Sequence, residues 1–273
     1  MMRILFLGDV VGRNARKKVM ENLGPLRQEL ELDFIIVNVE NAAGGFGVTP
    51  EIAQGFIDAG ADVLTTGNHV WDKRDIIPYI EKESRLIRPF NMVEGTPGKG
   101  IVTVTNDKGQ RLGVANLICN LFMAENENVF AALEQVLMRM KMGRDADAIV
   151  LDIHGEATSE KSAIGFAADG RVSLVVGTHT HIPTADHRIL PDGTAYQTDA
   201  GMCGDYTSII GMDPEAAVGR FTGKSQGRLE VAKGEATLSG VLIETDDATG
   251  LARKITPLRR GGALAATEKD TSS

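Results

Sequence analysis

Three of the chain's five histidines lie in one short segment, VVGTHTHIPTADH, and two of them, His179 and His181, are separated by a single residue. A tight turn does not require this pair, and an apolar core rarely contains it. Residues i and i+2 of a strand share a face, so both imidazoles can point at one place. Imidazole is a common ligand of first-row transition metals. The segment therefore indicates a metal site, provided that other parts of the chain supply further ligands.

Four further apolar runs end in the same manner, with side chains that can bind a metal ion or transfer a proton. The runs RILFLG, FIIVNV, DVLTTG and AIVLDI are followed, in that order, by Asp9, by Glu40 and Asn41, by Asn68 and His69, and by His154. Each residue alone has an ordinary explanation as a turn, capping or hydrogen-bonded structural residue. The carboxyl ends of parallel strands in one α/β sheet, however, open onto one crevice. If the five runs lie in one sheet, all of these side chains meet there.

The mixture of these side chains narrows the choice of metal. Imidazole, carboxylate and amide oxygen, without a thiolate, suit first-row ions such as manganese, iron or zinc. Seven such groups exceed the ligands that one tetrahedral zinc ion needs. A pair of ions about 3.5–4 Å apart, bridged by a carboxylate, uses them all. We therefore expect His179 and His181 to bind different ions of a dinuclear centre.

The segments between these runs predict an α/β fold. A helix is expected at 14–32, with a break near Gly24-Pro25 because proline disfavours a continuous helix. A second is expected at 50–59, after an N-cap at Thr49. Further helices are expected near 73–82, 128–141 and 159–169. Hairpins are expected at 100–119, 187–201 and 238–258. The alternation of strands and helices in the first part of the chain predicts parallel strands covered by helices. The last part of the chain is richer in hairpins and predicts a second, more mixed sheet packed on the first. We expect one domain, residues 1–262, and a disordered tail, 263–273.

Composition and charge set limits on location and partners. The 273 residues are 42% hydrophobic, and no apolar run approaches the roughly 18 residues of a membrane helix. Cys119 and Cys203 form no CxxC pattern, which fits a reducing compartment, so we expect a cytoplasmic protein with no membrane partner. A net charge of −8 gives no electrostatic footprint for duplex nucleic acid. An anionic substrate would need local cations, which bound metal ions can supply.

The order of the motifs resembles that of the calcineurin-like metallophosphoesterase superfamily. The blocks GDVVGR, NVENAAGG, TTGNHVWD, LDIHGEATSEK and VVGTHTHIPTAD follow the superfamily's order from Arg3 to about Asp199. The superfamily has a histidine where this chain has Val11, and a bridging aspartate where it has Glu40. In these departures, and in NVENAAGGFGVT and TDAGMCGDYTSIIGM, the chain is similar to the bacterial YmdB-type branch.

The resemblance implies a four-layer α/β/β/α sandwich of the metallo-dependent phosphatase type. It also implies two divalent or trivalent transition metal ions, iron or manganese in the first place, with zinc as a further candidate. Asp9 and His181, with Asn41, would hold the first ion, and Glu40 would bridge. Asn68, His154 and His179 would hold the second ion. His69 would face the substrate oxygen as a catalytic acid or transition-state donor.

The same resemblance implies hydrolysis of a small phosphodiester, with 2′,3′-cyclic nucleotides as substrates and a hydroxide held by the ions as the attacking group. It also suggests a homo-oligomer. Two other classes of function stay open. One is a metal- or nucleotide-binding regulatory protein with little turnover, and the other is a metal-dependent hydrolase of a different bond, such as an amide. The presence of His69 beside a complete ligand set favours catalysis, because a binding protein needs no proton donor.

Overall fold

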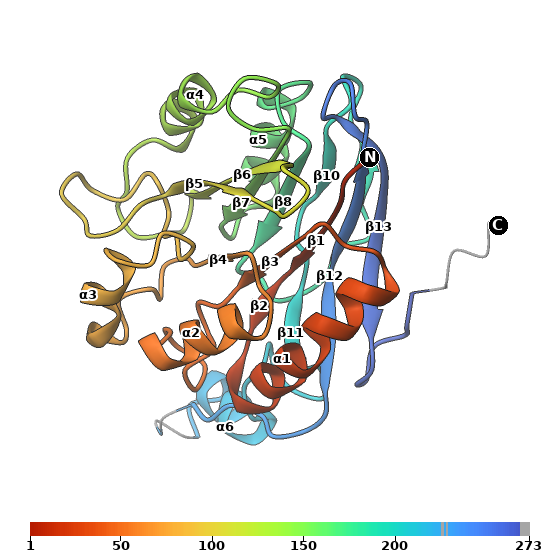
Figure 1. The fold of residues 1–273 in the computed structure, drawn as a ribbon. Helices are drawn as coiled ribbons and strands as arrows, with labels where there is room; N and C mark the ends of the chain where they lie inside the picture. The colour runs from red at the N-terminus through yellow and green to blue at the C-terminus, as the bar shows by residue number, and fades with distance from the viewer. Residues whose placement is uncertain (225–226, 228, 268–273) are drawn as a thin grey trace.

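Two β-sheets packed face to face form the centre of the molecule (Figure 1). A computed structural model describes residues 1–224, 227 and 229–267 of the chain. The first sheet has the strand order β2-β11-β12-β1-β3-β4, with β13 also paired to β12, and the second has the order β5-β6-β7-β8-β10-β9. The strands of the first sheet are β1 (Arg3–Leu7), β2 (Asp9–Val10), β3 (Phe34–Asn38), β4 (Val63–Thr65), β11 (Met202–Asp205), β12 (Ala236–Thr245) and β13 (Ala252–Arg260). Those of the second sheet are β5 (Ile101–Thr105), β6 (Arg111–Ile118), β7 (Ala148–His154), β8 (Leu174–Thr178), β9 (Arg188–Ile189) and β10 (Ala195–Gln197).

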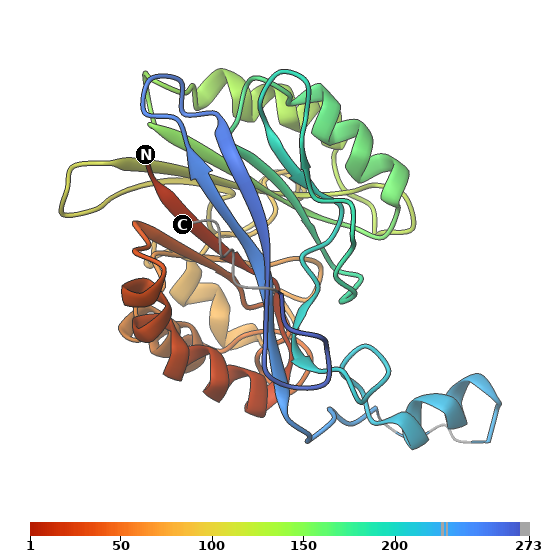
Figure 2. The ribbon, with the colours of Figure 1, turned by 90° about the vertical axis from the view of Figure 1, so that its right-hand side faces the viewer.

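Helices cover the outer faces of both sheets and complete four layers (Figure 2). One apolar cluster joins α1 (Gly12–Glu29) and α2 (Pro50–Asp58) to the first sheet. A second cluster joins α4 (Val129–Arg139) and α5 (Thr158–Ala167) to the second sheet. A third cluster, which includes the buried Phe6, fills the space between the sheets; full burial of such a side chain contributes about 1.5–3 kcal/mol. The α/β/β/α sandwich is therefore confirmed.

Local sequence signals explain several element boundaries. Thr49 Oγ1 accepts a hydrogen bond from the Ile52 N–H (3.3 Å), and Pro50 opens α2 as predicted. The predicted turn within 100–119 joins the antiparallel strands β5 and β6. The helix predicted near 73–82 is shorter and divides into a 3-10 turn, η1 (Arg74–Ile76), and one α-helical turn, α3 (Ile77–Ile80). After β11 the chain projects as an arm that carries α6 (Pro214–Phe221; Figure 2).

Helix α1 runs through Pro25, so the predicted break near Gly24-Pro25 is wrong. A proline ring clashes with the N–H and the Cβ of the residue before it, and Gly24 has no Cβ. Leu23 and Leu26 are buried against the first sheet, whereas Gly24 and Pro25 are exposed. Burial of the inner face therefore offsets the backbone hydrogen bond that proline cannot donate.

The closing hairpin, β12–β13, belongs to the first sheet, so the division into a parallel front sheet and a mixed back sheet is wrong. β12 pairs antiparallel with β1, with Leu242 opposite Leu5, and β3 pairs parallel with the other edge of β1. The second sheet contains its own parallel run, β6-β7-β8-β10. The strands that end in candidate ligands are consequently divided between two sheets.

The predicted tail, 263–273, is described only as far as residue 267. The Thr267 N–H donates to the Arg259 carbonyl (3.3 Å), and Thr267 Oγ1 accepts from the Arg259 N–H (3.2 Å). Residues 268–273 lie outside the described residues. Among the helices in the described part of the chain, none is both long and apolar enough to cross a membrane.

Candidate metal centre

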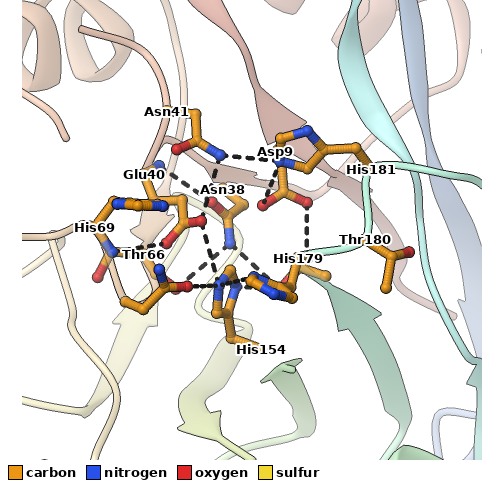
Figure 3. Close-up of polar contacts among 12 residues, drawn as sticks. Asp9, Asn38, Glu40, Asn41, Thr66, His69, His154, His179, Thr180 and His181 are labelled. Atoms are coloured by element: carbon orange, nitrogen blue, oxygen red, sulfur yellow. Dashed lines mark hydrogen bonds and ion pairs between the residues drawn. The ribbon is translucent and has the colours of Figure 1, made fainter. Parts of the chain in front are cut away.

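The carboxyl ends of strands from both sheets meet at one edge of the sandwich and bring the predicted site residues together (Figure 3). Asp9 follows β1 and opens β2, and His154 is the last residue of β7. The remaining candidates lie in the turns that follow β3, β4 and β8, and they are Glu40, Asn41, Asn68, His69, His179 and His181. The condition that all five runs lie in one sheet is not met. The candidate residues converge because the parallel strands of the two packed sheets end on the same side.

Glu40, Asn68, His154 and His179 form a first group. His154 Nε2 lies 2.8 Å from Asn68 Oδ1, 3.1 Å from His179 Nδ1 and 3.2 Å from Glu40 Oε1. One ligand atom each of Glu40, His154 and His179 lies within 4.8 Å of the other two. The side chains of Glu40 and His154 are fully buried.

Hydrogen bonds behind this group set the tautomer of His154. Thr178 Oγ1 donates to Asp152 Oδ1 (2.7 Å), so it accepts from His154 Nδ1–H (3.0 Å). Nε2 then faces the Asn68 and Glu40 oxygens, with a lone pair in the neutral imidazole and with an N–H in the protonated ring. Buried acceptors that converge in this way need a shared cation or proton. The donor set of the first group therefore fits a metal ion.

Asp9, Asn41 and His181 form a second group. His181 Nε2 lies 3.0 Å from Asn41 Nδ2 and 4.0 Å from Asp9 Oδ1. His181 Nδ1–H donates to the Ile210 carbonyl (2.8 Å), which directs the Nε2 lone pair toward the centre. Within the described residues, Asp9 Oδ1 and Asn41 Oδ1 are buried and have no hydrogen-bond partner. Because an orphaned buried oxygen is costly, the second group also fits a cation.

Glu40 lies between the two groups. Its Oε1 is 3.2 Å from His154 Nε2 in the first group and accepts from Asn41 Nδ2 (3.3 Å) in the second. The groups also meet through the backbone, because the His179 N–H donates to Asp9 Oδ2 (3.2 Å). The site is thus one continuous polar cluster with a carboxylate at its middle.

The sequence predicted that His179 and His181 share a strand face. They do not, because β8 ends at Thr178. Both lie in a turn with left-handed backbone, with φ values of 96° and 67°. This conformation is costly for residues with a Cβ, and it persists where the surrounding structure enforces it. The turn sends the His179 ring to the first group and the His181 ring to the second (Figure 3).

Burial and charge set the protonation states of the cluster. Burial raises the pKa of Asp9 to about 6. Burial acts in the same direction on Glu40. In the metal-free cluster, however, the charges of Glu40 and Asp9 raise the pKa of His154 against its burial, and the charge and hydrogen bond of the protonated ring lower the pKa of Glu40 to about 2. Burial and the charge of His154 lower the pKa of His179 to about 3. Near neutral pH Glu40 is therefore a carboxylate and His179 a neutral imidazole, which are the forms that bind metal ions.

His69 lies at the edge of the cluster with 30% of its side chain exposed. Its Nδ1 is 3.0 Å from Asp72 Oδ2, and the Phe46 ring packs edge-on against it with 5.0 Å between ring centroids. Its backbone N–H donates to Glu40 Oε2 (3.4 Å). Because the Asp72 carboxylate holds Nδ1, the other ring nitrogen is the one that can exchange a proton with a bound molecule.

Several residues that support the cluster were not predicted. Asn38 Nδ2 donates to Asp152 Oδ2 (3.1 Å), and Asn38 Oδ1 accepts from the Glu40 N–H (3.1 Å). Both Asn38 and Asp152 interrupt apolar runs of the sequence, which is the signal of a buried hydrogen-bond network. Glu156 Oε2 lies 3.4 Å from His179 Nε2. Glu156 does not interrupt an apolar run, so no sequence pattern indicated this contact. The fifth histidine, His187, is exposed and lines a separate small pocket.

The four-layer fold and this set of side chains define a metallophosphoesterase of the calcineurin-like superfamily. Within that class, the chain belongs to the YmdB-like family, whose model, described as YmdB-like protein, matches residues 5–258. It is 47% identical over 254 residues to the 2′,3′-cyclic-nucleotide 2′-phosphodiesterase of Bacillus subtilis strain 168, covering 93% of this chain and 95% of that protein.

Two solved structures share the fold over nearly the whole chain. One is a hypothetical protein from Thermus thermophilus, with 37% identity, a TM-score of 0.88, and coverage of 95% of this chain and 99% of that one. The other is described as a novel phosphatase from Mycoplasma pneumoniae, with 34% identity, a TM-score of 0.87, and coverage of 95% and 93%. The resemblance inferred from the sequence motifs is therefore confirmed, and the protein is an enzyme of this class.

Proposed function

We propose that this chain is a dinuclear metal-dependent phosphodiesterase that hydrolyses 2′,3′-cyclic nucleotides. The observation that carries the proposal is the position of Glu40, whose Oε1 lies 3.2 Å from His154 Nε2 and 3.3 Å from Asn41 Nδ2. A buried carboxylate between two sets of ligands is what a pair of ions needs as a bridge. The substrate class rests on the name of the Bacillus subtilis relative.

The proposal divides the ligands between two ions. Asp9, Asn41 and His181 would hold the first ion, and Asn68, His154 and His179 the second, with Glu40 shared. Imidazole, carboxylate and amide donors favour iron or manganese, with zinc as a further candidate. When bound, two such ions would supply Lewis-acid chemistry at this site, by lowering the pKa of water and polarising phosphoryl oxygens.

The chain's own side chains complete the chemistry. The Asp152–Thr178–His154 hydrogen bonds keep the His154 Nε2 lone pair directed at the centre. Asp72 orients His69 through Nδ1 (3.0 Å), so that the opposite ring nitrogen can protonate the departing oxygen or stabilise charge on the phosphoryl group. The negative charge of a phosphodiester would be balanced at the centre despite the chain's net charge of −8.

A substrate panel on metal-loaded protein tests the proposal. Protein loaded with manganese or iron is assayed against 2′,3′-cyclic AMP, 3′,5′-cyclic AMP, a cyclic dinucleotide and bis(p-nitrophenyl) phosphate, and its metal content is measured by mass spectrometry. We expect two ions per chain and the highest kcat/KM on 2′,3′-cyclic AMP. Tight nucleotide binding without turnover would favour the regulatory alternative. Hydrolysis of an amide panel without phosphodiester hydrolysis would favour the other alternative, a metal-dependent hydrolase of a different bond.

Gly67→Ala should remove metal from the centre without unfolding the chain. A Cβ at Gly67 would overlap Glu40 Oε2 and the His154 imidazole, so the carboxylate and the imidazole must move apart. Displacement of ligands held by their surroundings costs roughly 10–100-fold in metal affinity. Gly55→Ala is the matched control, because a Cβ there meets only the flexible end of the Met20 side chain, whose Cε lies 3.0 Å away. Metal content measured after dialysis should fall for Gly67→Ala alone; full occupancy in that variant would contradict the proposed ligand set.

A further inference from the structure

A lysine and an aspartate form a buried ion pair directly behind the turn that carries the two histidines. Lys161 Nζ lies 2.9 Å from Asp199 Oδ2, and the two side chains are 1% and 0% exposed. Lys161 comes from α5, and Asp199 lies between β10 and β11. The stem of Lys161 crosses β8 so closely that a Cβ at Gly177 would lie 2.9 Å from Lys161 Cδ. None of the proposed metal ligands or proton donors is part of this pair.

The pair binds the chain on both sides of His179. Lys161 Nζ donates to the Thr178 carbonyl (2.7 Å). Asp199 Oδ2 accepts from both the Thr180 N–H (3.1 Å) and the Thr180 Oγ1 hydroxyl (2.8 Å). The other carboxylate oxygen, Asp199 Oδ1, accepts from the Gly201 N–H (2.8 Å). Thr178 and Thr180 are therefore fixed to one buried pair, with His179 between them.

This turn needs such an anchor because its backbone is unfavourable. His179 and His181 have φ values of 96° and 67°, and left-handed backbone at residues with a Cβ persists only where the surroundings enforce it. A buried ion pair, in turn, is weak support for stability, because desolvation offsets most of its attraction. The hydrogen bonds of this pair go to the turn. Holding the turn therefore explains the presence of the pair better than a contribution to overall stability does.

We propose that Lys161 and Asp199 are positioning residues, which hold the Thr178–His181 turn in the left-handed conformation that aims the two imidazoles into the metal centre. The proposal deepens the proposed function, because it assigns the device that sets the distance between the two ligand groups. It rests on the proposed function only for the expected effects on metal affinity and turnover. The order of the turn itself can be measured without metal or substrate.

The decisive variant is the double replacement Lys161→Met/Asp199→Leu, which exchanges the ion pair for apolar side chains. Such exchanges of buried pairs are often neutral for stability, whereas a single replacement leaves a buried unpaired charge and is strongly destabilising. We expect a folded chain with a lower melting temperature, because the Thr180 and Gly201 N–H groups lose their acceptor. Backbone hydrogen exchange in the segment 178–182 of the metal-free protein should be faster. Segments in β1 and α4 should exchange as in the native chain.

The same variant should lose metal affinity or turnover by roughly 10–100-fold, the usual cost of removing a residue that orients ligands. The loss should fall on kcat and on manganese binding, with KM for bis(p-nitrophenyl) phosphate changed by less than about threefold, since the pair does not touch the substrate. The exposed pair Arg171–Glu134 offers a matched control. Arg171→Met/Glu134→Leu should leave exchange, metal binding and kcat unchanged.

Thr180→Val tests the proposal without any buried charge change, because it removes only the hydroxyl bond to Asp199. We expect a smaller loss of kcat, about fivefold, the equivalent of one net hydrogen bond. Native exchange in 178–182 and native manganese affinity in both Lys161→Met/Asp199→Leu and Thr180→Val would overturn the proposal. A native chain that binds no metal and hydrolyses no phosphodiester would instead overturn the proposed function, while hydrogen exchange would still decide the role of the pair.

Discussion

His181→Ala should reduce turnover of bis(p-nitrophenyl) phosphate by at least about 100-fold, more than the loss expected when only a supporting residue is removed. His181 Nε2 is the nitrogen donor of the second group, 3.0 Å from Asn41 Nδ2 and 4.0 Å from Asp9 Oδ1. Its removal leaves that group with oxygen donors alone, so one of the two proposed ions should be lost. The fold should survive, because the ring packs in a turn at the edge of the sheets and not in the apolar clusters.

The measurement combines kcat, metal content and thermal unfolding on the same preparations. We expect metal content to fall from two ions to one per chain, with a partial rescue of kcat at high manganese concentration. His187→Ala is the control, because His187 lies in the same segment of the sequence, is exposed and lines a different pocket. If His181→Ala and the native chain have equal rates, the catalytic interpretation of the centre is wrong.

The residues of the centre could be predicted from the sequence because chemistry and local structure coincide at strand ends. A run such as RILFLG is recognisable as a buried strand, and Asp9 directly after it is conspicuous. What the pattern could not decide is which strands pair. β7 and β8 have the same apolar character as β1 and β3, so nothing local places His154 in the second sheet. The candidate side chains do lie close together, but the single sheet that the sequence argument took as its condition is not what brings them there.

The geometry of the histidine turn was beyond local prediction for a different reason. Periodicity places residues two apart on one face only while the strand continues. Here the strand ends at Thr178, and the left-handed backbone of His179 and His181 depends on contacts from Lys161 and Asp199, 17 to 19 positions away from the residues they hold. Such φ values are enforced by tertiary contacts, and these have no signature in the turn's own residues.

The break predicted at Pro25 failed for the opposite reason, because a local rule was applied without its local exception. Pro25 follows a glycine, which removes part of the clash that normally ends a helix at this point. The burial of Leu23 and Leu26 then decides the matter in favour of a continuous α1. The hairpin 238–258 was recognised as a hairpin, but its place in the first sheet follows from the pairing of β12 with the edge of β1 opposite β3, which no local pattern reveals.

His69→Ala should keep the metal ions and lose turnover, by roughly 10²–10⁴-fold if His69 is the general acid. The contact of this residue with Glu40 is made by its backbone N–H (3.4 Å), which alanine retains. The hydrogen bond and the ring contact of the imidazole go to Asp72 and Phe46. Metal content should therefore equal that of the native chain, and loss of metal in this variant would show that His69 is a ligand or a support of one.

The leaving group distinguishes the two roles open to His69. A nitrophenolate departs without a proton, whereas the ribose oxygen released from a 2′,3′-cyclic nucleotide needs one. A general acid therefore predicts a much larger loss for the cyclic nucleotide than for bis(p-nitrophenyl) phosphate, while a donor to the phosphoryl oxygens predicts similar losses for both. Asp72→Asn should follow the same pattern with a smaller loss, because it leaves the ring in place but weakens the carboxylate that orients it. Equal losses for both substrates in both variants would assign His69 to charge stabilisation and leave the proton to another donor.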